Sequence, residues 1–282
     1  MPTALAGERP VVLGATGGTG SSMLRTALAG VGAYMGEVLP VGCEAELGRP
    51  LTGVEVNRHG DFLPFMAVLD RIVPAILRVV RRLDYAVSDL PSDLARDALG
   101  AVRRTVDGLR TGKPEGAAVW GWKNPRTIFV LPLLAEVMPD LTYVHVIRDG
   151  RAVAISPNQI QMERHYADLF TEQPGPDTAV ASIRFWAATN LQAMACGRRL
   201  FGSRYHLFRL EDATATGDGS FPALVRDLLP GCPAERLEAA RAILVPPSRH
   251  GWEDLPPDRR AAIEAAGADG LARFGYRPLG RS

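Results

Sequence analysis

The stretch Pro10-Val11-Val12-Leu13-Gly14-Ala15-Thr16-Gly17-Gly18-Thr19-Gly20-Ser21-Ser22 joins a short apolar segment to a run of glycines and hydroxyl side chains. Residues 10–13 are typical of a buried strand, and residues 23–29, which follow the glycines, are typical of a helix. A strand, a glycine-rich turn and a helix direct backbone N–H groups and the positive end of a helix toward one point. This order predicts an anion-binding loop in an α/β fold.

The same loop could also be a tight turn without a ligand, or the fingerprint of a dinucleotide-binding fold. Gly14, Gly17 and Gly20 have the spacing of that fingerprint. A dinucleotide fold requires a second strand soon after the first helix, but the chain instead continues through Gly32 and Gly36. No tyrosine is followed four residues later by a lysine, as hydride chemistry of that type needs. These features argue against an oxidoreductase.

A third interpretation is a phosphate loop of the P-loop kind. A nucleotide kinase or phosphotransferase would carry a lysine directly after Gly20, but this chain has Ser21 there. What remains is a loop whose N–H groups, together with the hydroxyls of Thr19, Ser21 and Ser22, could hold one phosphosulfate without a metal ion.

Strand-like and helix-like segments alternate along the rest of the chain. Apolar residues recur at helical spacing over residues 65–83 and 94–109, before the next strong strand at 117–122. We therefore predict an α/β fold with a P-loop-type parallel sheet flanked by helices and with a helical cap. We expect residues 1–282 to form a single domain, with residues 37–112 as a cap over an acceptor site. Further strands are expected at 141–147 and 205–210, and further helices at 178–196, 220–229, 234–244 and 257–274.

Bulk composition restricts the classes of partner. The chain has 282 residues, of which 46% are hydrophobic, and its formal net charge is +1 at pH 7. This charge predicts no polybasic face for nucleic acid or an anionic membrane, so an anionic ligand must be held by a local cluster. Only Lys113 and Lys123 among the 32 basic residues are lysines. A lysine inside the dense motif around residue 123 suggests a role for a compact ammonium group.

Other patterns bear on cofactors and location. Three widely spaced cysteines favour a reducing compartment, and no His/Cys spacing typical of zinc occurs, so we expect no metal. The first residues lack the pattern of a signal peptide. The apolar stretch 128–135 is broken by Pro132 and is too short to span a bilayer. We therefore expect a cytoplasmic protein.

A second anion site is indicated by the segment 148–156. Arg148 ends a predicted strand, and Ser156 follows eight positions later. The planar guanidinium of Arg148 and the hydroxyl of Ser156 could bind one phosphate. Two anion sites at two strand ends suit a nucleotide that carries charge on both its 5′ and 3′ sides.

These elements together resemble the sulfotransferases that use 3′-phosphoadenosine 5′-phosphosulfate (PAPS), and most of all their bacterial members. Gly17, Gly18, Thr19, Gly20, Ser21 and Ser22 are similar to the family's 5′-phosphosulfate loop, and Arg148 to Ser156 to its 3′-phosphate motif. The resemblance runs in family order from residue 11 to 276. Its other elements are Trp120-Gly121-Trp122-Lys123-Asn124-Pro125, Phe208-Arg209-Leu210-Glu211-Asp212, Ser248-Arg249-His250-Gly251-Trp252 and Phe274-Gly275-Tyr276.

The resemblance implies roles for particular residues. Lys123 is the expected cation at the bridging oxygen of the donor, and Arg249 belongs to a loop expected to close over the nucleotide. A general base is expected after the first helix, where we favour Asp61 and then His59 over the other acids, Glu37, Glu44, Glu46 and Glu55. Family members commonly carry a basic residue in the loop where this chain has Gly18 and Ser22, and Arg25 is a candidate substitute.

The resemblance also implies a function. We expect transfer of a sulfuryl group from PAPS to a hydroxyl or amine of a small-molecule or carbohydrate acceptor, with release of 3′-phosphoadenosine 5′-phosphate. The alternatives are a P-loop nucleotide kinase or phosphotransferase and a degenerate sulfotransferase-like protein that only binds nucleotides. The composition, rich in arginine and alanine, suggests a GC-rich bacterium, in which natural-product or glycoconjugate sulfation is a plausible setting.

Overall fold

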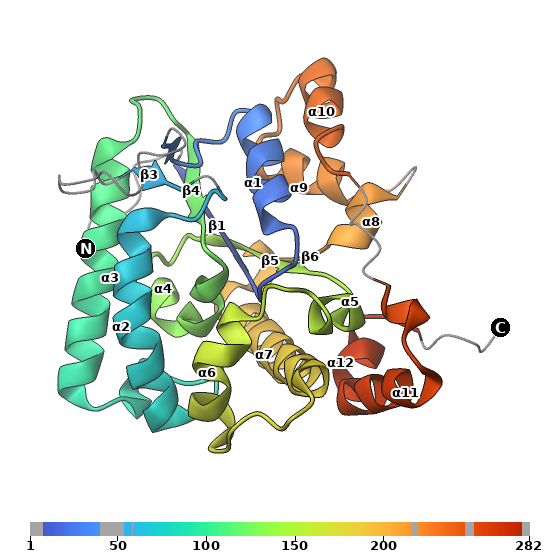
Figure 1. The fold of residues 1–282 in the computed structure, drawn as a ribbon. Coiled ribbons are helices and arrows are strands. Elements are labelled where there is room, and N and C mark those ends of the chain that lie inside the picture. Colours follow the sequence, from blue (N-terminus) through green and yellow to red (C-terminus); the bar gives the residue numbers. More distant parts are fainter. Residues whose placement is uncertain (1–7, 40–53, 58, 216–218, 246–250, 278–282) are drawn as a thin grey trace.

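The core of the molecule is a sheet of four parallel strands (Figure 1). The computed structural model describes residues 8–39, 54–57, 59–215, 219–245 and 251–277. The strands lie in the order β4-β1-β5-β6, with bounds β1 (Arg9–Ala15), β4 (Val119–Lys123), β5 (Thr142–Ile147) and β6 (Tyr205–Arg209). The predicted α/β fold with a parallel sheet and flanking helices is therefore confirmed.

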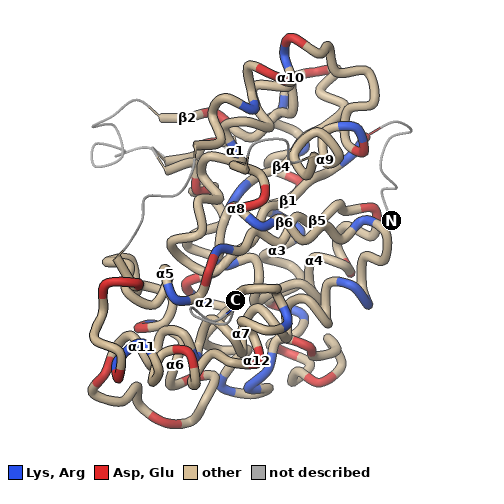
Figure 2. Tube along the Cα trace, turned by 90° about the vertical axis from the view of Figure 1, so that its right-hand side faces the viewer, with Lys and Arg blue, Asp and Glu red and all other residues tan. Residues whose placement is uncertain are grey.

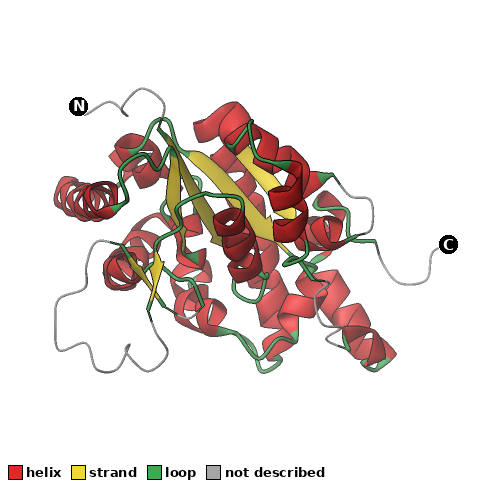
Figure 3. Ribbon diagram, turned by 90° about the horizontal axis from the view of Figure 1, so that it is seen from above, coloured by secondary structure: helices red, strands yellow, loops and turns green. Residues whose placement is uncertain are grey.

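Helices cover both faces of this sheet, as the view from above shows (Figure 3). Successive side chains of β1 point to opposite faces of the sheet and so pack against different helices. Val11 and Leu13 pack into the cluster that contains α1, α9 and α10, whereas Val12 packs into the cluster that contains α2, α3, α4 and α7. The continuous apolar character of the strand, which the sequence shows at residues 10–13, follows from this burial on both sides.

The helices occupy the following ranges: α1 (Ser21–Gly30), α2 (Leu63–Val80), α3 (Ser92–Gly112), α4 (Leu131–Val137), α5 (Gly150–Ala154), α6 (Ile160–Phe170), α7 (Thr178–Phe201), α8 (Leu210–Thr214), α9 (Ser220–Leu228), α10 (Ala234–Arg241), α11 (Pro257–Ala266) and α12 (Ala268–Arg273). Short 3₁₀ helices occur at η1 (Val87–Asp89), η2 (Pro125–Phe129), η3 (Gly202–Arg204) and η4 (Trp252–Asp254). A small second sheet pairs β2 (Glu37–Val38) with β3 (Glu55–Val56). No described helix is both long enough and apolar enough to cross a membrane.

Two local predictions differ from the structure. The helix predicted over 257–274 is two helices that meet at Gly267, where a side-chain carbon would lie 2.5 Å from Ile183 of α7. Close packing on α7 explains why a glycine stands at this junction. Glu211 and Asp212, expected at the end of a strand, lie in the first turn of α8. Their carboxylates are favourable there because the start of a helix carries partial positive charge.

Helices α2 and α3, from the segment predicted to form a cap, lie side by side at the β4 edge of the sheet (Figure 1). Phe62 and Phe65 bury their rings against Trp122 of β4, with ring centroids 5.7 Å apart in both pairs. This packing fixes the start of α2 beside the carboxyl end of β4. The residues just before α2 are therefore held close to Lys123, the last residue of that strand.

Candidate functional site

The glycine-rich loop has the backbone geometry that its sequence predicts. Gly18 and Gly20 adopt positive φ angles of 77° and 74°, a left-handed conformation that costs other residues strain. Gly20 is the N-cap of α1, and its carbonyl accepts a hydrogen bond from the N–H of Met23. A side-chain carbon at Gly20 would lie 2.6 Å from Leu210. These glycines therefore allow a tight turn between β1 and α1.

The hydroxyl groups of Thr19 and Ser22 in this loop differ in their hydrogen bonding. Thr19 is 1% exposed, and its hydroxyl has no hydrogen-bond partner among the described residues. Ser22 instead donates its hydroxyl proton to the carbonyl oxygen of His59, 2.7 Å away. An unpaired buried hydroxyl is costly unless a ligand or water completes it. Thr19 is thus available to a ligand, while Ser22 holds the segment before α2 against the loop.

Lys123 and Asp61 form an ion pair beside this loop. The Lys123 ammonium nitrogen, Nζ, lies 2.7 Å from Oδ1 of Asp61 and donates a second hydrogen bond to the His59 carbonyl, 3.2 Å away. The backbones of Asp61 and Lys123 form a parallel bridge, and the N–H of Phe62 bonds to the Lys123 carbonyl. This pairing sets the two side chains next to each other.

Burial and charge act in opposite directions on Lys123. The side chain is 4% exposed, and this loss of water lowers the pKa of its ammonium group, while the neighbouring Asp61 carboxylate raises it. The pKa is lowered overall because burial has the larger effect. The ammonium group of Lys123 therefore loses its proton at a lower pH than that of an exposed lysine.

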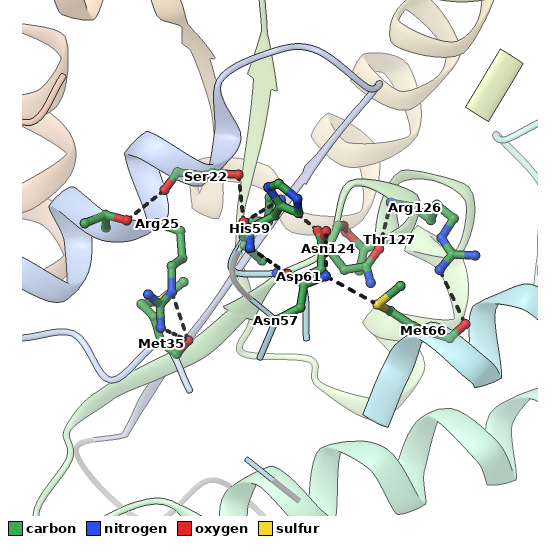
Figure 4. A network of polar contacts seen from close by, with 12 residues as sticks. Ser22, Arg25, Met35, Asn57, His59, Asp61, Met66, Asn124, Arg126 and Thr127 are labelled. Atoms are coloured by element: carbon green, nitrogen blue, oxygen red, sulfur yellow. Dashed lines mark hydrogen bonds and ion pairs between the residues drawn. The ribbon is translucent and has the colours of Figure 1, made fainter. Parts of the chain in front are cut away.

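Asn57 organises the segment that carries the two candidate bases. Its Oδ1 atom accepts hydrogen bonds from the backbone N–H groups of His59 and Asp61, both at 2.9 Å. Its side-chain amide also contacts the Asp61 carboxylate, at 3.4 Å (Figure 4). The sequence analysis did not assign Asn57 a role. An asparagine shortly before a glycine is typical of a tight turn, and this was the available signal.

A cavity of about 370 Å³ connects these groups. The glycine-rich loop, His59, Asp61 and Lys123 line one part of it, so the structure brings together the predicted catalytic residues and the predicted loop. The rest of the lining comes from the turn after β4, from α2 and from the start of α6. Those residues are Asn124, Pro125, Arg126, Met66, Asn158, Ile160, Gln161 and Arg164. The helix α6 was not predicted, and its contribution was therefore missed.

The second predicted anion site adjoins the same loop at Gly18. A guanidinium nitrogen of Arg148 (Nη1) donates to the carbonyl oxygen of Gly18, at 3.2 Å. A side-chain carbon added to Gly18 would lie 3.3 Å from the Ser156 hydroxyl, so both residues adjoin Gly18. Neither lines the cavity that holds Lys123. The two predicted anion sites are thus neighbours that share the glycine-rich loop.

Glu211 connects the second site to the end of the described chain. Its carboxylate accepts hydrogen bonds from the Asp149 N–H at 2.8 Å and from the Tyr276 hydroxyl at 3.0 Å. It also raises the pKa of Arg148, although burial lowers that pKa overall. The late Glu-Asp element and the Phe-Gly-Tyr element of the sequence therefore meet beside Arg148.

Several other candidates lie elsewhere. The guanidinium of Arg25 donates to the carbonyl oxygens of Met35 and Gly36, and Arg25 does not line the cavity. Glu37 and Glu55 lie in the small sheet and are not part of the cavity lining either. His145 lies in the core, where its two ring nitrogens contact the Tyr205 hydroxyl and the Asn190 side chain. Arg249, Glu44 and Glu46 lie outside the described residues.

Comparisons with known proteins identify a family through a family model and a fold through solved structures. The family model described as "Sulfotransferase family" matches residues 10–228. Sulfotransferase STF1 from Mycobacterium tuberculosis H37Rv has a TM-score of 0.56 and 14% identity, over 93% of this chain and 76% of that one. Sulfotransferase STF9 from Mycobacterium avium has a TM-score of 0.56 and 15% identity, over 98% and 79%.

The sulfotransferase domain from the curacin biosynthetic pathway has a TM-score of 0.51 and 14% identity, over 98% of this chain and 99% of that one. Identities this low show a shared fold and no more. No curated protein matches the sequence significantly. Because the family model covers well over half of the sequence, this chain belongs to the sulfotransferase family.

Proposed function

We propose that this chain transfers a sulfuryl group from PAPS to a hydroxyl or amine of an acceptor molecule. The observation that carries the proposal is the position of Lys123. Its ammonium group is buried at the wall of a cavity that the loop 17–22 also lines, and a carboxylate lies 2.7 Å from it. A cation, an anion-binding loop and a basic carboxylate in one cavity are the groups that sulfuryl transfer needs.

The residues around the loop fit the two ends of the donor. The phosphosulfate would bind the N–H groups of the loop and the start of α1, where the unpartnered hydroxyl of Thr19 would complete its hydrogen bonds. The 3′-phosphate would bind Arg148 and Ser156, which adjoin Gly18. Arg148 also supplies positive charge beside Gly18, where family members commonly carry a basic residue of their own.

The chemistry requires one bond to form and one to break. The acceptor oxygen or nitrogen attacks sulfur, and the bond between sulfur and the bridging phosphate oxygen breaks, which releases 3′-phosphoadenosine 5′-phosphate. Asp61 would take the proton of the acceptor, and His59 is the alternative base. Lys123 would stabilise the charge that develops on the bridging oxygen. The ion pair between Asp61 and Lys123, with N and O atoms 2.7 Å apart, supports this proposal of two adjacent roles.

Helix α2 could form one wall of the acceptor-binding site. Met66 of α2 and Ile160 of α6 line the same cavity as the glycine-rich loop. An acceptor bound there would lie between these side chains and the donor. This arrangement supports residues 37–112 as a cap over the acceptor site, within one sulfotransferase domain.

Calorimetry with 3′-phosphoadenosine 5′-phosphate, ATP and NADPH tests the donor class. We expect binding of the 3′,5′-bisphosphate and much weaker binding of the other two. Tighter binding of ATP would support a kinase or phosphotransferase instead. Turnover is tested by the release of the bisphosphate from PAPS with a panel of hydroxyl and amine acceptors. Binding of the bisphosphate without turnover of any acceptor would support a protein that only binds nucleotides.

A further inference from the structure

Two arginines of the cavity lining converge on one carboxylate oxygen. Arg126 of η2 and Arg164 of α6 both line the cavity, and both donate to Oδ1 of Asp70, which lies on α2. Figure 4 shows Arg126 on the far side of Asp61 from Ser22. Asp61 therefore lies between Arg126 and Ser22 of the loop in this view, and neither Arg148 nor Ser156 lines this cavity.

The cluster has more positive charge than its single carboxylate balances. Asp70 carries one negative charge, while Arg126 and Arg164 carry two positive charges in total. Each guanidinium offers several N–H donors in a planar fork, and the described contacts use only some of them. Elsewhere in the cavity wall, the charge of Lys123 is matched by Asp61. The unbalanced positive charge is thus at the arginine end of the cavity.

A purely structural role accounts fully for neither arginine. Arg164 bridges α6 to Asp70 of α2, but Arg78 and Asp168 already link the same two helices at 2.8 Å. Arg126 belongs to neither helix, and its side chain is only 8% exposed. Burial of a cation is unfavourable unless an anion compensates it. Asp70, itself 48% exposed and shared with Arg164, compensates it only in part.

We infer that Arg126 and Arg164 bind an anionic group of the acceptor, such as a carboxylate, a phosphate or a sulfate. The inference rests on the proposed function and specifies its acceptor class: a hydroxyl or amine joined by a short apolar spacer to an anion. The spacer would contact Met66 and Ile160, and the nucleophile would lie at Lys123 and Asp61. Figure 2 shows both signs of charge interspersed along the chain, so the selectivity comes from this cluster rather than from a broad basic face.

Paired probes that differ only in charge test this site. The binding of 4-hydroxyphenylacetate and of its neutral amide, 4-hydroxyphenylacetamide, is measured by calorimetry, with and without saturating 3′,5′-bisphosphate. We expect the carboxylate to bind about 10- to 100-fold more tightly than the amide, as charge-assisted hydrogen bonds allow. Equal affinities, or no measurable binding of the carboxylate, would overturn the inference.

Matched variants locate the binding. Arg164→Gln should reduce the preference for the carboxylate about tenfold or more. Arg78→Gln, which breaks the other ion pair between α2 and α6 outside this cavity, should leave that preference unchanged. Equal losses in the two variants would indicate a purely structural role. Asp70→Asn removes the competing carboxylate, so it should strengthen binding of the anion, whereas a weakened site would contradict the inference.

The donor site provides a separate readout. Arg164→Gln should bind the 3′,5′-bisphosphate as the unmodified protein does, because the nucleotide is expected at the loop and at Arg148. A parallel loss of nucleotide affinity would assign the arginines to the donor and overturn the inference. Failure of the unmodified protein to bind the bisphosphate would contradict the proposed function. The preference for the anionic probe would still be measured separately.

Discussion

The Nζ atom of Lys123 lies 2.7 Å from the Oδ1 atom of Asp61, although the two residues are 62 positions apart in the chain. The contact joins the end of a central strand to the turn that leads into α2. It places a cation and a carboxylate at one wall of the cavity, within reach of the same ligand. The Asp61 carboxylate raises the pKa of Lys123, and this effect can be measured.

Substitution of Lys123 tests the cation. Lys123→Met keeps an unbranched side chain that is only one atom shorter and removes the charge, so we expect kcat to fall by about 100- to 1,000-fold. Affinity for the 3′,5′-bisphosphate should be largely kept, since the loop and Arg148 remain. Steady-state kinetics with PAPS and calorimetry measure the two effects.

The chain provides a matched control in Lys113, its other lysine. Lys113 is also little exposed, and its Nζ atom lies 3.1 Å from the Glu8 carboxylate, away from the cavity. Lys113→Met should leave kcat unchanged. A folded Lys123→Met protein with undiminished turnover would remove Lys123 from the mechanism.

Substitution of Asp61 tests the base and its effect on Lys123. Asp61→Asn should lower kcat by about 100-fold or more through loss of the base. The Asp61 carboxylate raises the pKa of Lys123, so its removal should lower that pKa further. In the proposed mechanism the protonated lysine is the active form, so activity should be lost as pH rises through its pKa. The alkaline limb of the pH profile should therefore move to lower pH.

His59 is the comparison for this experiment. His59→Gln should retain most of the turnover if Asp61 is the base. A large loss in His59→Gln together with near-normal activity in Asp61→Asn would reverse the assignment.

Arg148 is expected to recognise the 3′-phosphate. Arg148→Ala should weaken binding of 3′-phosphoadenosine 5′-phosphate by about 10- to 100-fold, as loss of hydrogen bonds to a charged group implies. Binding of AMP, which lacks the 3′-phosphate, should change much less. Calorimetry with both nucleotides measures the difference. If the unmodified protein bound both nucleotides equally, Arg148 would have no such role.

The left-handed conformation of Gly20 predicts a stability effect. Gly20→Ala places a side-chain carbon at φ 74°, 2.6 Å from Leu210. We expect the free energy of unfolding to fall by at least about 1 kcal/mol, measured by urea denaturation. Gly219→Ala is the control, because Gly219 has a negative φ and no atom of the described residues lies within 4 Å of an added carbon. Equal stability of the two variants would contradict the described loop geometry.

His165 predicts a pH dependence of stability. Its ring is 1% exposed, and burial, assisted by the charge of Arg126, lowers its pKa to about 4. Between pH 4 and 6.5 the unfolded chain then binds a proton that the folded protein does not. Stability should therefore fall as pH falls through this range, by up to about 1.4 kcal/mol per pH unit. His165→Phe should have a shallower pH dependence, and identical slopes would show that His165 titrates normally.

Local sequence determined the type of fold and the position of the anion-binding loop. The apolar strand at residues 10–13, the glycines that adopt left-handed angles and the helix that follows are properties of neighbouring residues. Backbone conformation and periodicity act over short distances, so they can be recognised without a structure. The strand ends at Lys123 and Arg148 were predictable for the same reason.

The contacts within the cavity were decided only by tertiary structure. Nothing near Asp61 in the sequence indicates that it pairs with Lys123, since that contact depends on Phe62 and Phe65 packing on Trp122. The convergence of Arg126 and Arg164 on Asp70 likewise requires η2, α2 and α6 to meet. Side chains far apart in the sequence come together only when the core packs, and the geometry of that packing depends on the whole chain.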